Sequence, residues 1–247
     1  MKTELSGSNA LITGAAKRIG REIAISLAEK GVNILIHYRS SNEEAEELKG
    51  KLRGLGVKAI SLQADLKKNS DLEGLISRAK SKVDRLDYLV NNAAVFPPGS
   101  LNELEFEELV DNVRINAWAP FYLARSFVEL SECGKVVNLL DTRVAGYDWD
   151  HAGYYFSKIL LARMTKMMAI KFAPEFTVNG VAPGLVIPPE GLGENYLKER
   201  TDRVPLKKHG EEEDVSRAII YLLESNFVTG QIIYVDGGRN LLHELEG

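Results

Sequence analysis

Residues 9–20 read Asn-Ala-Leu-Ile-Thr-Gly-Ala-Ala-Lys-Arg-Ile-Gly, an apolar run that passes through a glycine into residues spaced for a helix. The run 9–13 predicts a buried strand, and the spacing over 18–30 predicts the helix that follows. Such a turn lets the backbone approach a pyrophosphate, and the helix N-terminus supplies free N–H donors. The spacing of Gly14 and Gly20 departs from Gly-x-Gly-x-x-Gly, so an ordinary tight connection is the alternative. We favour a dinucleotide site.

The alternation of strand and helix continues beyond this turn to the end of the chain. Strand-like runs occupy residues 9–13, 32–38, 57–63, 86–91, 135–140, 177–182 and 231–235. Helical patterns between them include residues 18–30, 43–53, 70–82 and 154–172. Continuous apolar strands that alternate with helices predict a parallel sheet covered on both faces. We therefore predict an α/β fold: one doubly wound domain over residues 1–247, with about seven parallel strands.

The composition excludes several other classes of protein. The 247 residues are 45% hydrophobic and 27% charged, with a single cysteine, so a disordered or disulfide-stapled chain is excluded. Cys133, the absence of a signal-like N-terminus and the absence of a long apolar run together favour the cytoplasm. The net charge is −4 and the basic residues are scattered, so we expect a small-molecule substrate and neither nucleic acid nor membrane. The four histidines lack ligand spacing, and we expect no metal.

The end of the second predicted strand bears on the choice of cofactor. It reads His37-Tyr38-Arg39-Ser40, and no acid follows until Glu43. An NAD site would place a carboxylate here for the ribose hydroxyls, whereas Arg39 and Ser40 suit a 2′-phosphate. The alternative is that Arg39 is only a solvated loop cation. We predict NADP(H).

A tyrosine and a lysine share one face of the long helix predicted over 154–172. Tyr154 and Lys158 are four residues apart, and an ammonium beside a phenol is expected to lower the pKa of the tyrosine. Such a pair arises easily by chance, so its position supplies the evidence. It follows the fifth predicted strand, which ends at Asp141. Trp149 and His151, which lie between, either line a pocket or pack in a loop.

Seven landmarks in order make the chain resemble the short-chain dehydrogenase/reductase family. They are Thr13-Gly14 with Gly20, Asp65, Asn91-Asn92-Ala93-Ala94, Asn116, Tyr154 with Lys158, Pro183-Gly184, and Thr229-Gly230-Gln231 with Asp236-Gly237-Gly238. The resemblance implies a Rossmann-type fold, hydride transfer from a nicotinamide, and a homodimer or homotetramer, of which we expect the homotetramer.

The resemblance also implies roles for individual residues. Tyr154 would donate the proton, Lys158 would bind the nicotinamide ribose and tune Tyr154, Asn116 would hold a water in the proton relay, and Asp65 would lie at the adenine. The residues expected at the cofactor are Gly14, Lys17, Arg18, Ile19, Gly20, Tyr38, Arg39, Ser40, Asp65, Leu66, Asn92, Ala93, Ala94, Lys158, Pro183 and Gly184.

Two positions depart from the common family pattern. Arg18 replaces the middle glycine of the first turn, and Asp141 replaces a serine that stabilises an oxyanion. An ionised aspartate would repel that oxyanion, so simple ketone reduction is disfavoured. Both departures resemble the pteridine reductase branch, in which a phenylalanine, here Phe96, stacks on the pterin. That resemblance places Arg18, Phe96, Asp141 and Tyr154 at the substrate.

Three functions follow as hypotheses. The first is NADPH-dependent reduction of a pteridine C=N bond, from a dihydropterin or dihydrofolate to the tetrahydro form. The second is a carbonyl reductase, for example of a 3-oxoacyl carrier thioester. The third is a non-catalytic NADP-binding regulator, against which the joint presence of Tyr154, Lys158 and Asn116 argues. The segment 185–194 is expected to lie over the sheet edge as a lid.

Overall fold

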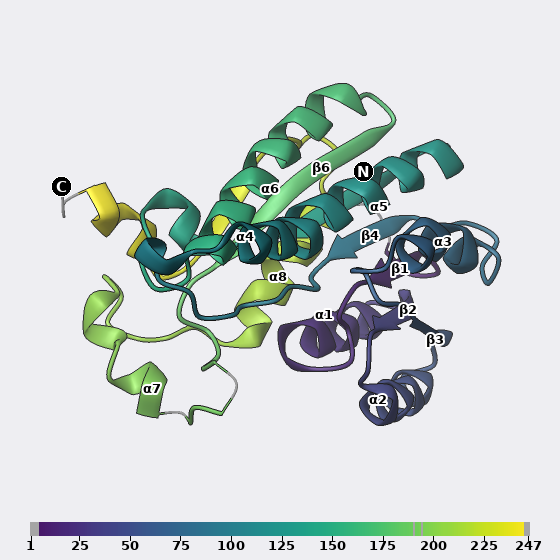
Figure 1. The fold of residues 1–247 in the computed structure, drawn as a ribbon. Helices are drawn as coiled ribbons and strands as arrows, with labels where there is room; N and C mark the ends of the chain where they lie inside the picture. Colours follow the sequence, from purple (N-terminus) through teal and green to yellow (C-terminus); the bar gives the residue numbers. More distant parts are fainter. Residues whose placement is uncertain (1–4, 190, 194, 245–247) are drawn as a thin grey trace.

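The computed structural model describes residues 5–189, 191–193 and 195–244 and places seven parallel strands in one sheet (Figure 1). The order across the sheet is β3-β2-β1-β4-β5-β6-β7. The strands are β1 (Asn9–Ile12), β2 (Asn33–Tyr38), β3 (Ala59–Gln63), β4 (Tyr88–Asn91), β5 (Gly134–Leu139), β6 (Phe176–Pro183) and β7 (Ile232–Val235). This arrangement confirms the predicted α/β, Rossmann-type, doubly wound fold, and each predicted strand is present with ends shifted by no more than two residues.

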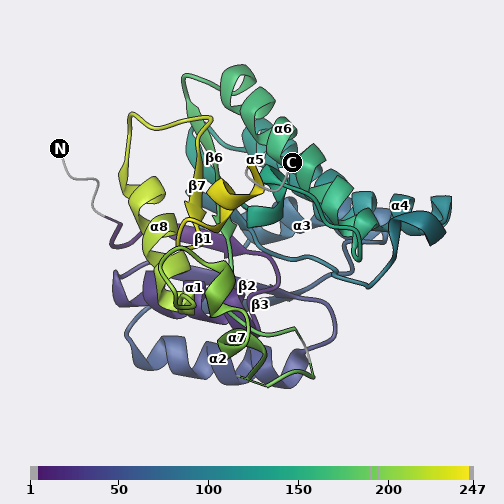
Figure 2. The same cartoon turned by 90° about the vertical axis from the view of Figure 1, so that its left-hand side faces the viewer.

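Helices cover both faces of the sheet, as Figure 2 shows from the side. One face carries α1 (Arg18–Glu29), α2 (Asn42–Gly54) and α8 (Glu212–Glu224). The other carries α3 (Asn69–Lys80), α5 (Ala119–Leu130) and α6 (Ala152–Lys171). The remaining helical segments are η1 (Leu101–Glu103), α4 (Phe106–Val113), the π-helical η2 (Arg114–Trp118), η3 (Thr142–Ala145), α7 (Asn195–Lys198), η4 (Thr201–Arg203) and η5 (Arg239–Glu244).

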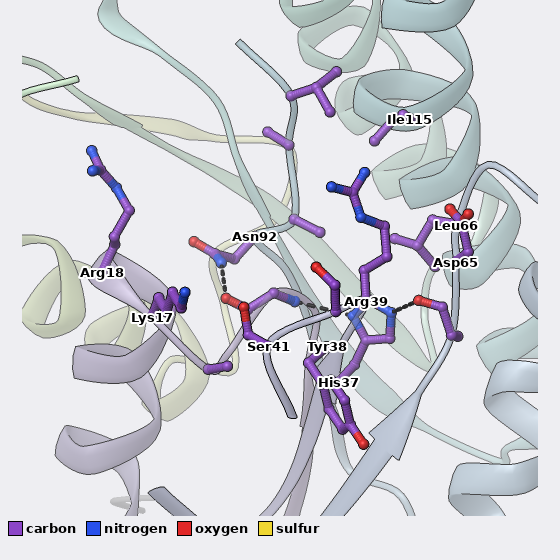
Figure 3. A pocket seen from close by; sticks show the side chains of 18 of the residues that line it. Lys17, Arg18, His37, Tyr38, Arg39, Ser41, Asp65, Leu66, Asn92 and Ile115 are labelled. Carbon is purple, nitrogen blue, oxygen red and sulfur yellow. Dashed lines mark hydrogen bonds between the residues drawn. The ribbon is translucent and has the colours of Figure 1, made fainter. Parts of the chain in front are cut away.

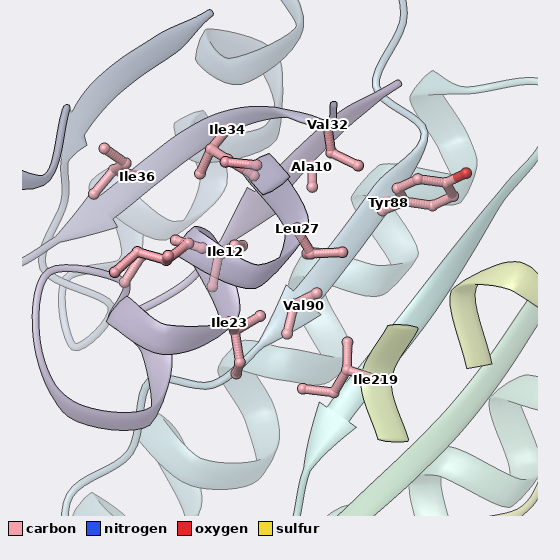
Figure 4. Packing of buried hydrophobic residues seen from close by; sticks show 14 of the residues in the cluster. Ala10, Ile12, Ile23, Leu27, Val32, Ile34, Ile36, Tyr88, Val90 and Ile219 are labelled. Carbon is pink, nitrogen blue, oxygen red and sulfur yellow. The ribbon is translucent and has the colours of Figure 1, made fainter. Parts of the chain in front are cut away.

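The strands alternate their side chains between two hydrophobic layers, which explains their continuous apolar sequence. Ile12 and its neighbours in β2 pack against α1 and α8, where Ile23, Leu27 and Ile219 meet them (Figure 4). Leu11 points to the opposite layer, which also holds the fully buried Phe127 of α5. No helix in the described part of the chain is both long and apolar enough to cross a membrane.

The strand order creates the place for a site. β1 lies between β2 and β4, so the connections that leave the carboxyl ends of β1 and β4 run to opposite faces of the sheet. A crevice forms at such a switch point in open α/β sheets, and ligands bind there. Most of the candidate cofactor residues lie in the turns that follow β1, β2, β3 and β4.

Candidate active site

A cavity of about 370 Å³ occupies the crevice beyond the carboxyl ends of β1 to β4 (Figure 3). Figure 3 shows Lys17 and Arg18 on one side of it, and Arg39, Asp65 and Leu66 on the other. Thirteen of the residues predicted at the cofactor line this cavity: Gly14, Lys17, Arg18, Ile19, Gly20, Tyr38, Arg39, Ser40, Asp65, Leu66, Asn92, Ala93 and Ala94. The other three, Lys158, Pro183 and Gly184, line the neighbouring cavity described below.

The glycines of the first turn are required by close packing. A Cβ on Gly20 would lie 2.2 Å from the carbonyl oxygen of Gly14, and Gly14 itself has φ of +63°. The Asn92 side chain donates to the carbonyls of Thr13 and Gly14 at 2.9 and 3.0 Å, and so ties the turn to the end of β4. Arg18 also adopts a positive φ, +56°, where the turn enters α1. The backbone is thereby open toward the cavity, as a pyrophosphate requires.

His37, at the floor of this cavity, is a structural residue that the sequence patterns do not reveal. Its Nδ1 accepts from the backbone N–H of Gly14 at 3.1 Å, which leaves Nε2 to donate to the carbonyl of Ala64, also at 3.1 Å. Burial lowers the pKa of His37 from 6.5 to about 4. The neutral ring therefore joins the first turn to the end of β3.

The adenosine end of the cavity carries positive charge without an acid at the end of β2. Arg39, Ser40 and Ser41 line it, which fits a 2′-phosphate. Lys17 lines the cavity as predicted, but its ammonium pairs with Glu44 of α2 at 2.7 Å. The Glu44 carboxylate thus offsets one of the charges expected to act on a phosphate, whereas the exposed Arg39 lies directly after β2, where a 2′-phosphate is expected.

A second cavity of about 250 Å³ adjoins the first along β5 and β6. Arg18, Ile19, Asn92, Ala94 and Ile187 line both. The second cavity brings together the predicted substrate and proton-transfer residues, namely Arg18, Phe96, Asp141, Tyr154 and Lys158. We call it the catalytic cavity.

The central contact of the catalytic cavity joins Tyr154 to Asp141. The Tyr154 hydroxyl donates to Asp141 Oδ2 at 3.0 Å, and the same carboxylate accepts from Arg143 Nη1 at 3.1 Å and from the Arg143 backbone N–H at 2.8 Å. Lys158 Nζ lies 5.6 Å from the centre of the Tyr154 ring and donates to the Leu139 carbonyl at 2.7 Å. Burial lowers the pKa of Lys158 from 10.5 to about 8.

The prediction that Lys158 lowers the pKa of Tyr154 is wrong for this arrangement. Burial of the phenol and the adjacent Asp141 carboxylate raise the pKa of Tyr154 well above 10, and the Arg143 charge opposes them only in part. The Lys158 charge, 5.6 Å from the ring centre, does not outweigh these two effects. Tyr154 is consequently a protonated donor at neutral pH, held by an acceptor that the common family pattern lacks.

Asn116 lies beside the site, outside the lining of either cavity. It sits in the π-helical turn η2, fully buried, and its amide nitrogen donates to the Val95 carbonyl at 3.0 Å and to Ser157 Oγ at 3.1 Å. Its side-chain oxygen accepts from the Val95 N–H at 2.8 Å. Because both amide hydrogens are used, the side chain fixes the segment after β4 against α6. Holding a relay water stays a prediction for this residue.

A network of ion pairs and ring contacts surrounds Phe96, and the sequence did not predict it. Arg143 pairs with Asp148 at 2.6 Å, and Asp148 contacts His151 Nδ1 at 3.3 Å. The His151 ring stacks on Phe96 with centroids 4.0 Å apart, and Phe96 meets Tyr154 edge to face at 4.6 Å. His151 stacks on Phe96, and the Arg143 guanidinium carbon lies over the same ring, 5.1 Å from its centroid. The ring is still 36% exposed, as contact with a substrate requires. An arginine two residues after an aspartate carries no signal that could have predicted this.

Arg18 links the first turn to the loop after β6. It lines both cavities and donates to the carbonyl of Pro188 at 2.6 Å. Leu185, Val186 and Ile187 from the predicted lid 185–194 line the catalytic cavity, while Glu190 and Glu194 lie outside the described residues.

Known proteins resemble this chain in sequence and in fold. A family model described as enoyl-(acyl carrier protein) reductase matches residues 14–240. The 3-oxoacyl-(acyl-carrier-protein) reductase FabG of Staphylococcus epidermidis is 29% identical over 238 residues, covering 93% of this chain and 98% of the relative. An oxidoreductase of Thermotoga maritima, described as uncharacterized, is 32% identical over 248 residues, covering 94% and 97%.

Solved structures point to the same group of proteins. The crystal structure of FolM alternative dihydrofolate reductase 1 from Brucella canis, complexed with NADP, superposes with a TM-score of 0.91 at 30% identity, covering 96% of each chain. The Brucella suis protein, also in complex with NADP, gives the same values. The chain belongs to the short-chain dehydrogenase/reductase family and is an oxidoreductase, as the sequence landmarks predicted.

Proposed function

We propose that this protein uses NADPH to reduce a C=N bond of a pteridine, converting a dihydropterin or a dihydrofolate to its tetrahydro form. The observation that carries the proposal is the Tyr154 hydroxyl bonded to Asp141 at 3.0 Å, beside Phe96, in the catalytic cavity. A carboxylate here accepts hydrogen bonds from the N–H groups of a heteroaromatic ring, and Phe96 offers a ring for stacking. The name of the Brucella relatives, an alternative dihydrofolate reductase, supports the same substrate class.

NADP(H) is the cofactor of this oxidoreductase. The residues present fit it: the glycine turn is open to a pyrophosphate, and Arg39 with Ser40 fits the 2′-phosphate. When bound, NADPH supplies the hydride that reduces the carbon of the C=N bond. Asp65 lines the cofactor cavity. Lys158 lines the catalytic cavity and donates to the carbonyl of Leu139 at the end of β5.

The chain's own residues supply the proton and fix the substrate. Tyr154 gives its hydroxyl proton to the nitrogen of the reduced bond, and Lys158, 5.6 Å from the ring centre, offsets the negative charge left on the phenol. Asp141 orients Tyr154 and accepts from substrate N–H donors, while Arg143 holds that carboxylate in place. General acid catalysis of this kind contributes about 10²- to 10⁴-fold.

A carbonyl reductase acting on a 3-oxoacyl carrier thioester is the second candidate, favoured by the FabG relative. Its developing oxyanion would lie beside the Asp141 carboxylate, which repels it. We therefore rank this activity below pteridine reduction. A non-catalytic regulator is the third candidate, and the assembled Tyr154–Asp141 pair argues against it.

A substrate comparison tests the proposal. NADPH oxidation is followed with dihydrobiopterin, dihydrofolate and a 3-oxoacyl thioester, using the wild type and Asp141→Ser. We expect turnover of a pterin by the wild type and a loss of about 100-fold or more in Asp141→Ser, with NADPH affinity unchanged. Turnover of the thioester alone, or full pterin activity in the variant, would contradict the proposal. Asp150→Ser, which changes an exposed aspartate outside both cavities, is the matched control.

We further propose that residues 1–247 form one domain, and that the protein acts in the cytoplasm as a homotetramer on a small-molecule substrate, without nucleic acid or membrane as a partner. The uninterrupted seven-stranded sheet and the mild net charge support these proposals.

A further inference from the structure

Within the described part of the chain, one arginine of the catalytic cavity has no hydrogen-bond or ion-pair partner. Arg239 begins η5, lines the cavity and is half-buried. Its guanidinium forms no hydrogen bond or ion pair with the side chains that the structure describes, those of residues 5–189, 191–193 and 195–242. The other two arginines that line the cavity are engaged: Arg143 pairs with two aspartates, and Arg18 donates to a backbone carbonyl.

The balance of charge around the cavity is positive. Its described lining contains four cationic side chains, Arg18, Arg143, Lys158 and Arg239, and a single carboxylate, Asp141. Asp141 and the nearby Asp148 both form ion pairs with Arg143. Burial and the neighbouring charge of Arg143 lower the pKa of Arg239, and the Asp141 carboxylate opposes them only in part. An added anion beside Arg239 would therefore be favourable.

The backbone that carries Arg239 is held firmly in place. Asp236 accepts from the N–H of Gly238 at 2.9 Å and from the N–H of Asn240 at 2.7 Å, on either side of the arginine. Thr142 of η3 donates to the same aspartate and ties this turn to the segment after β5. An arginine fixed in this way loses little backbone freedom when it binds a ligand.

The position of Arg239 separates its ligand from the cofactor. Arg239 does not line the cofactor cavity, where the first turn and Arg39 are the residues that we expect to contact the phosphates. It lines the catalytic cavity together with Tyr196 and the Leu185–Pro189 part of the loop. Because Arg239 lies outside the cofactor cavity, an anion that reaches it fits the substrate better than the cofactor phosphates.

We propose that Arg239, with Arg143 beside it, binds an oxyanion on the side chain of the substrate, a carboxylate or a phosphate. A planar guanidinium matches either group with two parallel hydrogen bonds. This proposal rests on the proposed function, which assigns a pteridine as the ring that is reduced. It narrows the substrates to pteridines that carry an anionic side chain. Dihydrofolate, with its glutamate carboxylates, and a pterin with a phosphorylated side chain are the two sources of such a group.

Steady-state kinetics with matched substrates test this selectivity. The substrates are dihydrofolate, dihydroneopterin 3′-phosphate and uncharged dihydroneopterin, assayed with the wild type, Arg239→Gln and Arg239→Lys. We expect Arg239→Gln to raise KM for at least one anionic substrate by about 10- to 100-fold and to change KM for dihydroneopterin by less than about twofold. The anionic substrate that responds identifies the source, and Arg239→Lys should recover part of the loss. Equal effects on all three substrates, or none, would overturn the proposal.

Arg203→Gln is the control variant. It removes the same charge from η4, near Arg239, at an exposed residue that lines neither cavity. We expect KM for every substrate to stay within about twofold of the wild type, since an exposed charge outside the cavity is screened by solvent. A loss equal to that of Arg239→Gln would mean that general electrostatics, rather than a site, produces the effect.

A binding measurement separates this proposal from the proposed function. Calorimetry of the NADP⁺-loaded enzyme compares p-aminobenzoylglutamate, a dianion without a pteridine ring, with its uncharged diamide. We expect the dianion to bind the wild type about 10-fold or more tightly than the diamide, and Arg239→Gln to abolish the difference. If this holds and no pterin is reduced, only the proposed function fails. If the dianion and the diamide bind the wild type equally, the oxyanion site is wrong even where pterins are turned over.

Discussion

Tyr154 and His37 are two buried side chains that the fold keeps in their neutral forms. Burial raises the pKa of Tyr154, with help from Asp141, and lowers the pKa of His37 to about 4. The first side chain thereby keeps the proton that it donates, and the second keeps the acceptor lone pair that holds Gly14. In both cases the same physical cause, the loss of hydration, serves a different part of the site.

The pKa of His37 predicts how stability depends on pH. Its folded pKa, about 4, lies below its ordinary value of 6.5, so the unfolded chain binds a proton that the native chain refuses. The stabilisation is complete above pH 6.5 and is lost as the pH falls toward 4. The loss approaches about 3 kcal/mol in the free energy of unfolding. Urea denaturation at a series of pH values measures it.

The control for this prediction is His37→Gln, which cannot titrate. Its free energy of unfolding should fall much less between pH 6.5 and 4.5, because the carboxylates with lowered pKa values, such as Asp214, titrate below this range. An equal fall in the variant and the wild type would show that another group is responsible.

At the scale of elements, the turn between β1 and α1 depends on a glycine inside a helix. Gly20→Ala would place a Cβ 2.2 Å from the Gly14 carbonyl and 2.6 Å from the Asn92 amide. We expect a loss of about 1–3 kcal/mol in stability and a weaker affinity for NADPH, because the whole turn must shift. Thermal unfolding and NADPH titration measure the two effects.

The chain offers a matched control for that change. Gly50 lies in α2 with nothing within 4 Å of the Cβ position. Gly50→Ala should stabilise the protein by about 0.5–1 kcal/mol, since alanine loses less conformational entropy in a helix. Equal effects from the two substitutions would refute the role given to the turn.

The elements and the first turn were predictable because they depend on local patterns. Hydrophobic runs located all seven strands, and the chain places Gly14 and Gly20 in the turn that the sequence indicated. The network of Arg143, Asp148 and His151 was not predictable, because a loop between β5 and α6 brings them onto Phe96. The pKa of Tyr154 was mispredicted because sequence spacing placed Lys158 near it but gave no distance for Asp141.

At the scale of the whole molecule, α6 exposes large apolar side chains on one face, with the exposed Arg163 among them. Phe156, Met167 and Ile170 are 40%, 69% and 83% exposed, and their spacing puts them on one side of the helix. Exposed apolar stripes of this kind mark protein contacts. The homotetramer that we propose would bury this stripe between subunits.

Ile170→Glu tests the assembly. A charge at the most exposed of the three positions should shift the protein to smaller species in sedimentation equilibrium, because an unpaired carboxylate is costly to bury. Leu55→Glu, at an exposed residue that follows α2 on the other face, should leave the mass unchanged. A wild type that sediments as a monomer would refute the assembly itself.

The position of Arg18 couples the binding of cofactor and substrate. Its side chain lines the cofactor cavity and the catalytic cavity, and it holds the Pro188 carbonyl of the loop above them. A ligand that contacts Arg18 in one cavity therefore shifts the preferred position of the Arg18 side chain in the other cavity. Such coupling is reciprocal, so whatever factor NADPH adds to the affinity for substrate, substrate adds to the affinity for NADPH. We therefore expect the two ligands to bind cooperatively through Arg18.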